Sequence, residues 1–270
     1  MPQRLSWEDL SDEIREVIRE HTGPLLKVES VADGINSEIA IIAHTATDTT
    51  FVKGVSSSDE QRSKALAREG MIGPFLGDIA PRLRWRAETP EWRLLGFEYL
   101  PGRHVDYTPG SPDLPKVADT LTRLGEFKCP PRFPLRLRYL EERMTNFTAP
   151  GNLLMFTGHA LLHTDLNPGN VLVSGERAYL VDWACPTIGA SWADAAGWVV
   201  CLITSGHSPQ QAEAWAARIP SWRTANQHAA DVFAESQAAT WKAVAEGSHD
   251  RWNLATAEAT QRWAEYRSRS

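Results

Sequence analysis

The sequence contains little cysteine and no apolar run long enough to cross a bilayer. It has 3 Cys residues, none in a Cys-x-x-Cys pair, so we expect neither a structural zinc site nor a disulfide framework. The longest apolar run near the C-terminus, residues 195–203, is too short for a membrane span. Residues 1–13 lack the apolar core of a signal peptide. These features predict a cytoplasmic protein that does not bind membranes.

An excess of positive charge is also absent. Lys+Arg 28 against Asp+Glu 34 gives a formal charge of −6, which argues against general binding of nucleic acid or of an anionic membrane. The composition, 42% hydrophobic and 23% charged, is that of an ordinary globular protein. A chain of 270 residues can form one large domain or two lobes with separate cores. The composition leaves the oligomeric state open.

Three short apolar runs, residues 161–162, 171–173 and 178–181, predict three buried strands close together in the chain. The turn-rich loop Asp165-Leu-Asn-Pro-Gly-Asn170 lies between the first two strands, and a hairpin turn joins the last two. The third strand ends at Asp182, which the closed hairpin would bring beside the loop. This segment is therefore the most informative part of the sequence.

Two side chains of this segment are placed to hold a cation. Asn170 ends the loop and Asp182 ends the third strand, so the hairpin would direct their oxygen atoms toward one point. Oxygen ligands of this kind suit a hard cation such as Mg²⁺. Asp165 would then remain able to accept a proton from a hydroxyl nucleophile.

The Asp-x4-Asn spacing, followed by an Asp on the next hairpin, is that of the catalytic loop of kinases. The segment most closely resembles the aminoglycoside phosphotransferase-like family, whose loop reads His-x-Asp-x-x-x-x-Asn with Pro-Gly before the Asn. The resemblance implies an α+β, two-lobed, protein-kinase-like fold with a small antiparallel-sheet N-terminal lobe and a mainly helical C-terminal lobe. It also implies a role for each residue of the segment: Asp165 as catalytic base, Asn170 and Asp182 as Mg²⁺ ligands, and His163 and Asp194 as structural supports of the loop.

Lys53 lies in the run Phe51-Val-Lys-Gly-Val55, which predicts a buried strand. A lone lysine on a buried strand needs an anionic partner. The helix that follows offers Glu69, with Glu60 as the other acid. The family resemblance makes Lys53 the ligand of the α- and β-phosphates and Glu69 the ion-pair partner that orients it.

The loop of residues 32–37 lacks the Gly-x-Gly-x-x-Gly of protein kinases. It resembles the shorter loop of the phosphotransferase family, in which a Gly, an Asn and a Ser, here Gly34, Asn36 and Ser37, expose backbone N–H groups to the nucleotide phosphates. At the end of the sheet, the resemblance places the nucleotide base against the carbonyl of Glu98 and the N–H of Leu100. These are backbone contacts, so the side chains leave ATP and GTP both possible.

The remaining pattern predicts regular elements around these motifs. A helix should begin at Ser6, with Asp9 as its capping-box partner, and another should be capped by Ser58. Pro101-Gly102 marks a hinge, and we place the nucleotide-binding lobe at residues 1–98 and the catalytic and substrate-binding lobe at residues 99–270. The predicted strands span residues 25–31, 38–45, 50–55, 83–88 and 92–99, and the later helices residues 58–76, 113–127, 137–144, 208–218, 224–246 and 250–267.

The resemblance implies transfer of the γ-phosphoryl group of a nucleoside triphosphate to a hydroxyl of a small molecule, with antibiotic inactivation as the leading biological role. From residue 207 onward the acidic and basic side chains number seven each, so a polycationic aminoglycoside would find no surplus of carboxylates. Eight of the 11 tryptophans follow the catalytic loop. Most should lie in the core, but a subset facing the cleft would favour a nucleoside, a sugar or another weakly charged acceptor.

Two alternatives remain open. A metabolic kinase of choline, a sugar or an amino alcohol would use the tryptophans as an aromatic cage. A nucleotide-binding regulatory protein without turnover is the alternative outside enzymes, and the intact motif residues argue against it. The arginines of residues 132–143 are either solvated helix charges or an anionic-substrate patch; they are Arg132, Arg136, Arg138 and Arg143.

Overall fold

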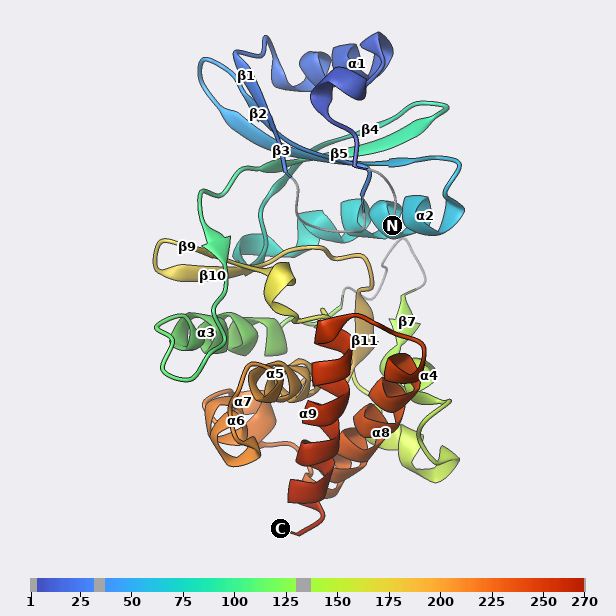
Figure 1. The fold of residues 1–270 in the computed structure, drawn as a ribbon, viewed down its shortest axis with the longest axis vertical. Helices are drawn as coiled ribbons and strands as arrows, with labels where there is room; N and C mark the ends of the chain where they lie inside the picture. The colour runs from blue at the N-terminus through green and yellow to red at the C-terminus, as the bar shows by residue number, and fades with distance from the viewer. Residues whose placement is uncertain (1–3, 32–36, 130–136, 270) are drawn as a thin grey trace. The chain divides into compact units, whose positions relative to one another are not determined.

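The computed structural model describes residues 4–31, 37–129 and 137–269, which form two compact units. The first unit comprises residues 1–102 and 180–185, and the second comprises residues 103–179 and 186–270. Within the described ranges, no helix combines the length and the apolar character needed to cross a membrane. Strands and helices are mixed in the α+β manner that the sequence predicts, with one antiparallel sheet of five strands (Figure 1).

The first unit is built on that five-stranded sheet, ordered β1-β2-β3-β5-β4, in which every neighbouring pair is antiparallel. Helices α1 and α2 lie on opposite faces of the sheet (Figure 1). The elements of this unit are η1 (Trp7–Asp9), α1 (Asp12–Thr22), β1 (Lys27–Ser30), β2 (Ile39–His44), β3 (Thr49–Ser56), α2 (Glu60–Ile72), η2 (Gly73–Phe75), η3 (Gly77–Ile79), β4 (Leu83–Glu88) and β5 (Trp92–Glu98).

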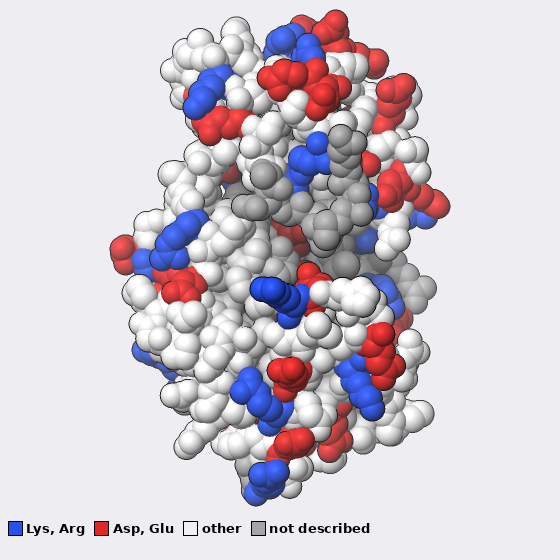
Figure 2. All heavy atoms as spheres, viewed as in Figure 1, with Lys and Arg blue, Asp and Glu red and all other residues white. Residues whose placement is uncertain are grey.

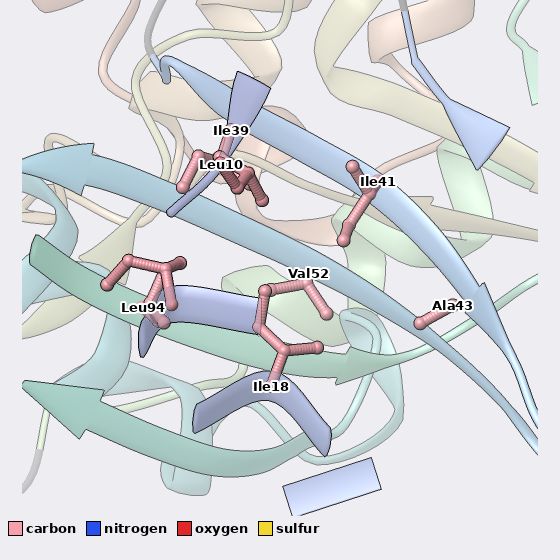
Figure 3. Packing of buried hydrophobic residues seen from close by; sticks show 8 residues of the cluster. Leu10, Ile18, Ile39, Ile41, Ala43, Val52 and Leu94 are labelled. Atoms are coloured by element: carbon pink, nitrogen blue, oxygen red, sulfur yellow. The ribbon is translucent and has the colours of Figure 1, made fainter. Parts of the chain in front are cut away.

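Each face of the sheet has its own core because successive side chains of a strand point to opposite faces. Leu94 belongs to one cluster with Ile18 of α1 (Figure 3) and with Ile14 of the same helix, whereas the next residue, Leu95, packs with Leu66 of α2. All of these side chains are nearly excluded from solvent. The α2 face is the one that carries the polar residues discussed below.

Two helix starts differ from the prediction. Ser6 and Asp9 do form the expected capping box, but Leu10 and Ser11 are extended, so the helix is divided into η1 and α1. Ser11 accepts from the N–H of Ile14 and gives α1 its own cap. At α2 the cap is Asp59, which accepts from the N–H of Arg62, and not Ser58. In both places, a short polar side chain other than the predicted one caps the α-helix: Ser11 at α1 and Asp59 at α2.

The second unit combines short strands with most of the helices. Its sheets are ordered β10-β9-β6 and β7-β11-β8, and α9 packs against α8 and α5 (Figure 1). Its elements are β6 (Arg103–His104), α3 (Leu114–Gly125), β7 (Arg138–Tyr139), α4 (Leu140–Met144), η4 (Pro150–Phe156), β8 (Ala160–Leu162), η5 (Pro168–Asn170), β9 (Val171–Ser174), β10 (Arg177–Leu180, its last residue in the first unit), β11 (Thr187–Gly189), α5 (Ala193–Thr204), α6 (Pro209–Ala216), α7 (Pro220–Arg223), α8 (Gln227–Glu246) and α9 (Arg251–Arg267).

Aromatic side chains fill the core of the second unit. Phe233 lies with its ring 5.5 Å from that of Trp192 and 6.3 Å from that of Trp263, and Trp198 contacts Tyr107 at 6.4 Å. Such edge-to-face pairs add to the hydrophobic gain of burying large rings. Five of the eight tryptophans that follow the catalytic loop are buried, namely Trp183, Trp192, Trp198, Trp222 and Trp263.

Residues 137–144 also depart from the prediction of one continuous helix. β7 pairs in parallel with β11, and only Leu140–Met144 is helical. Strand β11 was absent from the prediction because its partners, β7 and β8, are distant in sequence. Arg132 and Arg136 lie outside the described residues.

Candidate active site

Lys53 is the centre of a buried ion-pair cluster in the first unit. Its Nζ atom lies 2.8 Å from Glu69 Oε2 and 2.7 Å from Asp182 Oδ1. Lys53 comes from β3, Glu69 from α2, and Asp182 from the segment of residues 180–185 that belongs to the same unit. The pairing of Lys53 with Glu69, and not with Glu60, is therefore present as the sequence led us to expect; Glu60 pairs with Lys64 instead.

The strand that carries Lys53 is closely packed against the side chains of its two neighbouring strands. The next residue, Gly54, has no room for a side chain: a Cβ atom there would lie 2.6 Å from Leu94 Cδ2 and 3.1 Å from Ile39 Cβ. A larger residue would push β3 away from its neighbours, β2 and β5. Gly54 thus keeps the strand that carries Lys53 in register.

The cluster keeps its lysine charged. Burial favours the neutral amine, but the carboxylates of Glu69 and Asp182 outweigh it and raise the pKa of Lys53 above its ordinary value. Burial, and the nearby charge of Asp182, raise the pKa of Glu69, while Lys53 acts in the opposite direction. An ammonium held in this way is a fixed positive charge in a largely desolvated place, where electrostatic interactions are strong.

The segment that follows Asp182 is attached to α2 by two further contacts. The backbone N–H of Trp183 donates to Glu69, and Arg68 Nε donates to the carbonyl of Ala184 at 3.1 Å. Asp182 itself has φ 61°, a left-handed conformation that few residues other than glycine adopt. Such a conformation persists only where the surroundings impose it. Here Lys53 holds the Asp182 side chain, while Glu69 and Arg68 hold the backbone of the two residues that follow.

In the second unit, the loop after β8 holds Asp165 by hydrogen bonds within the loop. Asn167 Nδ2 donates to Asp165 Oδ1 at 2.8 Å, and Asn167 Oδ1 accepts from the N–H of Gly169 at 2.9 Å. Asn170 Nδ2 donates to the backbone carbonyl of Asp165 at 3.1 Å. Asp165 is exposed, whereas Asn170 is buried. The loop therefore presents a carboxylate whose position is set by two amide side chains.

His163 and Asp194 support the start of this loop. The two carboxylate oxygens of Asp194 accept from the backbone N–H groups of His163 and Thr164, each at 2.8 Å. His163 Nδ1 accepts from the N–H of Asp165 at 3.3 Å. Burial raises the pKa of Asp194, and His163, the two N–H groups and Arg143 oppose that shift. Both residues contact the loop as the sequence resemblance implied, and their roles in a reaction stay predictions.

The structure gives only the positions of the other residues predicted to contact the nucleotide. Ser37 is buried two residues before β2, while Gly34 and Asn36 lie outside the described residues. Glu98 ends β5, and Leu100, which is half-buried, follows it in irregular backbone. Their proposed contacts with nucleotide stay predictions.

The structure thus brings the predicted residues together in two groups, one in each unit. Lys53, Glu69 and Asp182 form the first group, and the loop residues with Asp194 form the second. Sequence reasoning missed Arg68 and Asn167. Asn167 could have been found from its place inside the Asp-x4-Asn loop. Arg68 could not, because its partner, Ala184, lies 116 residues away in the sequence.

The residues present suit Mg²⁺ and a nucleotide phosphate. Asn170 uses its nitrogen in the bond to Asp165, which leaves Oδ1, a hard oxygen ligand, as the amide atom for a cation. Lys53 is charged and fixed, as a phosphate ligand must be. Each group therefore carries side chains of a type that can bind Mg²⁺ or a phosphate, and their joint action stays a prediction.

Comparison with known proteins identifies the fold. No protein-family model and no curated protein matches the sequence. Among solved structures, the choline kinase of Streptococcus pneumoniae matches with a TM-score of 0.61 at 15% identity, covering 94% of this chain and 100% of that one. A macrolide 2′-phosphotransferase of Brachybacterium faecium matches with a TM-score of 0.53 at 18% identity, covering 93% and 98% of the chains. An aminoglycoside-3′-phosphotransferase of type VIII matches with a TM-score of 0.51 at 17% identity, covering 93% of this chain and 98% of that one.

Proposed function

We propose that this chain, which has the kinase-like fold of the aminoglycoside phosphotransferase-like proteins, transfers the γ-phosphoryl group of a nucleoside triphosphate to a hydroxyl of a small molecule. The observation that carries the proposal is the buried Lys53, held between Glu69 and Asp182. A lysine fixed in this way, together with a metal-binding carboxylate, is the phosphate-binding part of kinases. The hydrogen-bonded Asp165–Asn170 loop supplies the other part.

Each residue of the site has a task in this reaction. Asp165 accepts the proton of the acceptor hydroxyl as its oxygen bonds to the γ-phosphorus. The bond between that phosphorus and the β–γ bridging oxygen breaks, and the nucleoside diphosphate leaves with the bridging oxygen. Lys53 binds the α- and β-phosphates and offsets their charge, and Glu69 orients Lys53. Asn170 and Asp182 would hold Mg²⁺, which, when bound, offsets negative charge on the phosphates.

We assign nucleotide binding to the first unit and the acceptor to the second. Support for the first assignment comes from Lys53, from Ser37, which lies two residues before β2, and from Glu98, which ends β5. A solved structure of the same choline kinase holds AMP, at 14% identity to this chain. ATP is therefore the nucleotide we propose, with GTP as the alternative that backbone contacts to the base would also admit.

For the acceptor we favour a weakly charged, hydroxylated antibiotic, such as a nucleoside-type one, over an aminoglycoside. Arg267 lies 2.6 Å from Glu213 and 2.7 Å from Asp231, so two of the seven late acidic residues already have a buried cationic partner. A polycation needs unpaired carboxylates to offset the loss of its hydration. On the face drawn in Figure 2, basic and acidic side chains are interspersed, which supports the same preference.

A metabolic kinase of choline or an amino alcohol is the second candidate. It draws support from the match to the choline kinase over the whole length of that chain. Trp241 and Trp252 are half-buried, unlike the five tryptophans of the core, so their faces are candidates for contact with a quaternary ammonium. Because these two functions share the same phosphoryl-transfer machinery, only the acceptor separates them.

The test is a panel of acceptors with Mg²⁺ and ATP or GTP, read as phosphorylated product. The panel contains a nucleoside-type antibiotic, a macrolide, a kanamycin-type aminoglycoside, choline and an amino alcohol. We expect the highest kcat/KM with the nucleoside-type acceptor. A clear preference for the aminoglycoside would overturn our choice of acceptor, and a preference for choline would establish the second candidate. Nucleotide binding without product from any acceptor would favour the regulatory alternative.

A further inference from the structure

Thr164, the residue before the proposed base, has an unfavourable backbone conformation. Its φ angle is 65°, in the left-handed region, and among the described residues the only other non-glycine with positive φ is Asp182. A β-branched residue is a genuine outlier there because its Cβ substituents crowd the backbone. Such a conformation is strained and persists only where the surroundings over-determine it.

Arg143 contacts the side chain of this residue. Its Nη1 atom donates to Thr164 Oγ1 at 2.5 Å and to Thr187 Oγ1 at 2.6 Å. Arg143 comes from α4, and Thr187 from β11, where it lies opposite Leu162, the last residue before His163. One guanidinium therefore ties the start of the loop to a helix and to the neighbouring strand. This contact excludes the interpretation of Arg143 as a solvated helix charge.

Arg143 also acts on the residue that holds the Thr164 backbone. Asp194 accepts from the N–H groups of His163 and Thr164, and burial of its carboxylate raises its pKa. The positive charge of Arg143 opposes that effect and favours the ionised carboxylate. Ionised Asp194 is the better acceptor for two N–H groups. Arg143 thus contacts the Thr164 side chain directly, and its charge adds to the larger effects of His163 and the two N–H groups in favouring the carboxylate that holds the Thr164 backbone.

We propose that Arg143 is a positioning residue for Asp165, which holds Thr164 in its left-handed conformation so that the next residue presents its carboxylate to the acceptor hydroxyl. This role rests on the proposed phosphoryl transfer. It assigns no contact between Arg143 and substrate, and therefore differs from the anionic-substrate patch considered for the arginines of this segment. Glycine, which adopts positive φ without strain, would need no such support at position 164.

The test compares Arg143→Gln with Arg138→Gln. Arg138 lies five residues earlier on β7 with an exposed side chain, and it is the matched control. We expect Arg143→Gln to lower kcat on the order of 10²-fold, the effect of a small misplacement of a reacting group, with KM for ATP unchanged. Arg138→Gln should leave both constants at the parent values. A parent-like kcat in Arg143→Gln would overturn the inference.

A second background separates positioning from general stability. In a Thr164→Gly protein the backbone strain is gone, so adding Arg143→Gln should lower kcat much less than it does in the parent. If the fold-loss is the same in both backgrounds, Arg143 does not act through Thr164 and the inference is wrong. Thermal unfolding of all variants shows whether a loss of kcat merely follows a loss of folded protein.

A structural readout keeps this test independent of the proposed function. Amide hydrogen exchange of residues 160–166 should be faster in Arg143→Gln than in the parent and in Arg138→Gln, because the loop would lose the hydrogen bond from Arg143 that holds Thr164. Unchanged exchange would contradict the inference even if no acceptor is ever found. Conversely, faster exchange in a protein without turnover would show that Arg143 holds the loop, while the proposed phosphoryl transfer fails separately.

Discussion

Lys53 Nζ lies 2.7 Å from Asp182 Oδ1, although 129 residues separate the two in the sequence. Asp182 follows the catalytic-type loop in the chain but packs with the unit that contains Lys53. The contact joins the proposed phosphate ligand to a proposed metal ligand. It also gives the left-handed backbone of Asp182 a partner in a different part of the sequence.

The first prediction concerns the buried ion pair. Lys53→Met keeps the aliphatic stem and removes the charge, which leaves both Glu69 and Asp182 without their cation. We expect kcat to fall about 10²–10³-fold, as for loss of one electrostatic contact to a developing charge. Glu69→Gln should lower kcat less than Lys53→Met does, because Lys53 can still reach the phosphates. The matched control is Lys64→Met, which removes an exposed lysine from α2; a similar loss in this control would contradict the assignment.

The second prediction concerns Arg68, which holds the carbonyl of Ala184. Arg68→Gln should loosen the segment after Asp182 and weaken the apparent Mg²⁺ affinity roughly tenfold, as loss of an outer-shell contact does. Arg62→Gln, which removes the partner of Asp59 on the same helix, is the control and should bind Mg²⁺ like the parent. Mg²⁺ titrations of nucleotide binding measure this effect. Superimposable titrations for Arg68→Gln and the parent would refute it.

The third prediction concerns Asn167, whose amide holds Asp165 Oδ1 at 2.8 Å. Asn167→Ala should free the carboxylate to rotate and lower kcat about 10–100-fold, with little change in KM for ATP. Asn152→Ala, in η4 of the same unit, is the control. Steady-state kinetics with saturating acceptor give the two constants. An increase in KM for ATP without a change in kcat would show that Asn167 serves the nucleotide instead.

The fourth prediction is a pH dependence of stability. Asp113 accepts from Arg103 Nη1 at 2.6 Å, from Arg103 Nη2 at 2.9 Å and from the N–H of Asp106 at 2.9 Å. The hydrogen bonds from Arg103 are the main reason that the pKa of Asp113 lies below its ordinary value. A carboxyl group with a lowered folded-state pKa stabilises the protein above its unfolded-state pKa, and that contribution is lost as the pH falls through the folded-state value.

Asp113→Asn should therefore lower the free energy of unfolding by about 1–3 kcal/mol at neutral pH. The difference from the parent should begin to shrink as the pH falls below about 4, the unfolded-state pKa, and should vanish only below the folded-state pKa, where both proteins carry a neutral side chain. Denaturant unfolding of the two proteins at several pH values measures this. A difference that stays constant from neutral to acidic pH would show that the charge of Asp113 does not contribute.

Local patterns in the sequence predicted what local physics determines. Strand β4 begins and ends at Leu83 and Glu88, as predicted, because alternating side chains and the turn at residues 89–91 define it. The Asp165–Asn170 loop was recognisable because its turn residues and spacing lie in one short stretch. The pairing of Lys53 with Glu69 followed from the cost of burying an unpaired ammonium.

Contacts between distant segments could not be predicted from local sequence patterns. Nothing near Arg68 indicates Ala184 as its partner, and nothing near Arg143 indicates Thr187, because each pair forms only once the chain has folded. The left-handed conformations of Thr164 and Asp182 could not be predicted either, because neither residue type adopts positive φ often enough for the sequence to indicate it. In each unit, these contacts and conformations lie beside residues proposed to act in the reaction, where local rules are most often overridden.

The central claim is that Asp165 activates an acceptor hydroxyl for attack on the γ-phosphoryl group. The most direct measurement is transfer of a γ-labelled phosphoryl group from ATP to the acceptor panel by the parent and by Asp165→Asn, with nucleotide binding measured on the same samples. We predict labelled product from the parent, a drop of about 10²–10⁴-fold in Asp165→Asn, and equal nucleotide affinity in both. Equal rates of transfer in the two proteins would contradict the claim.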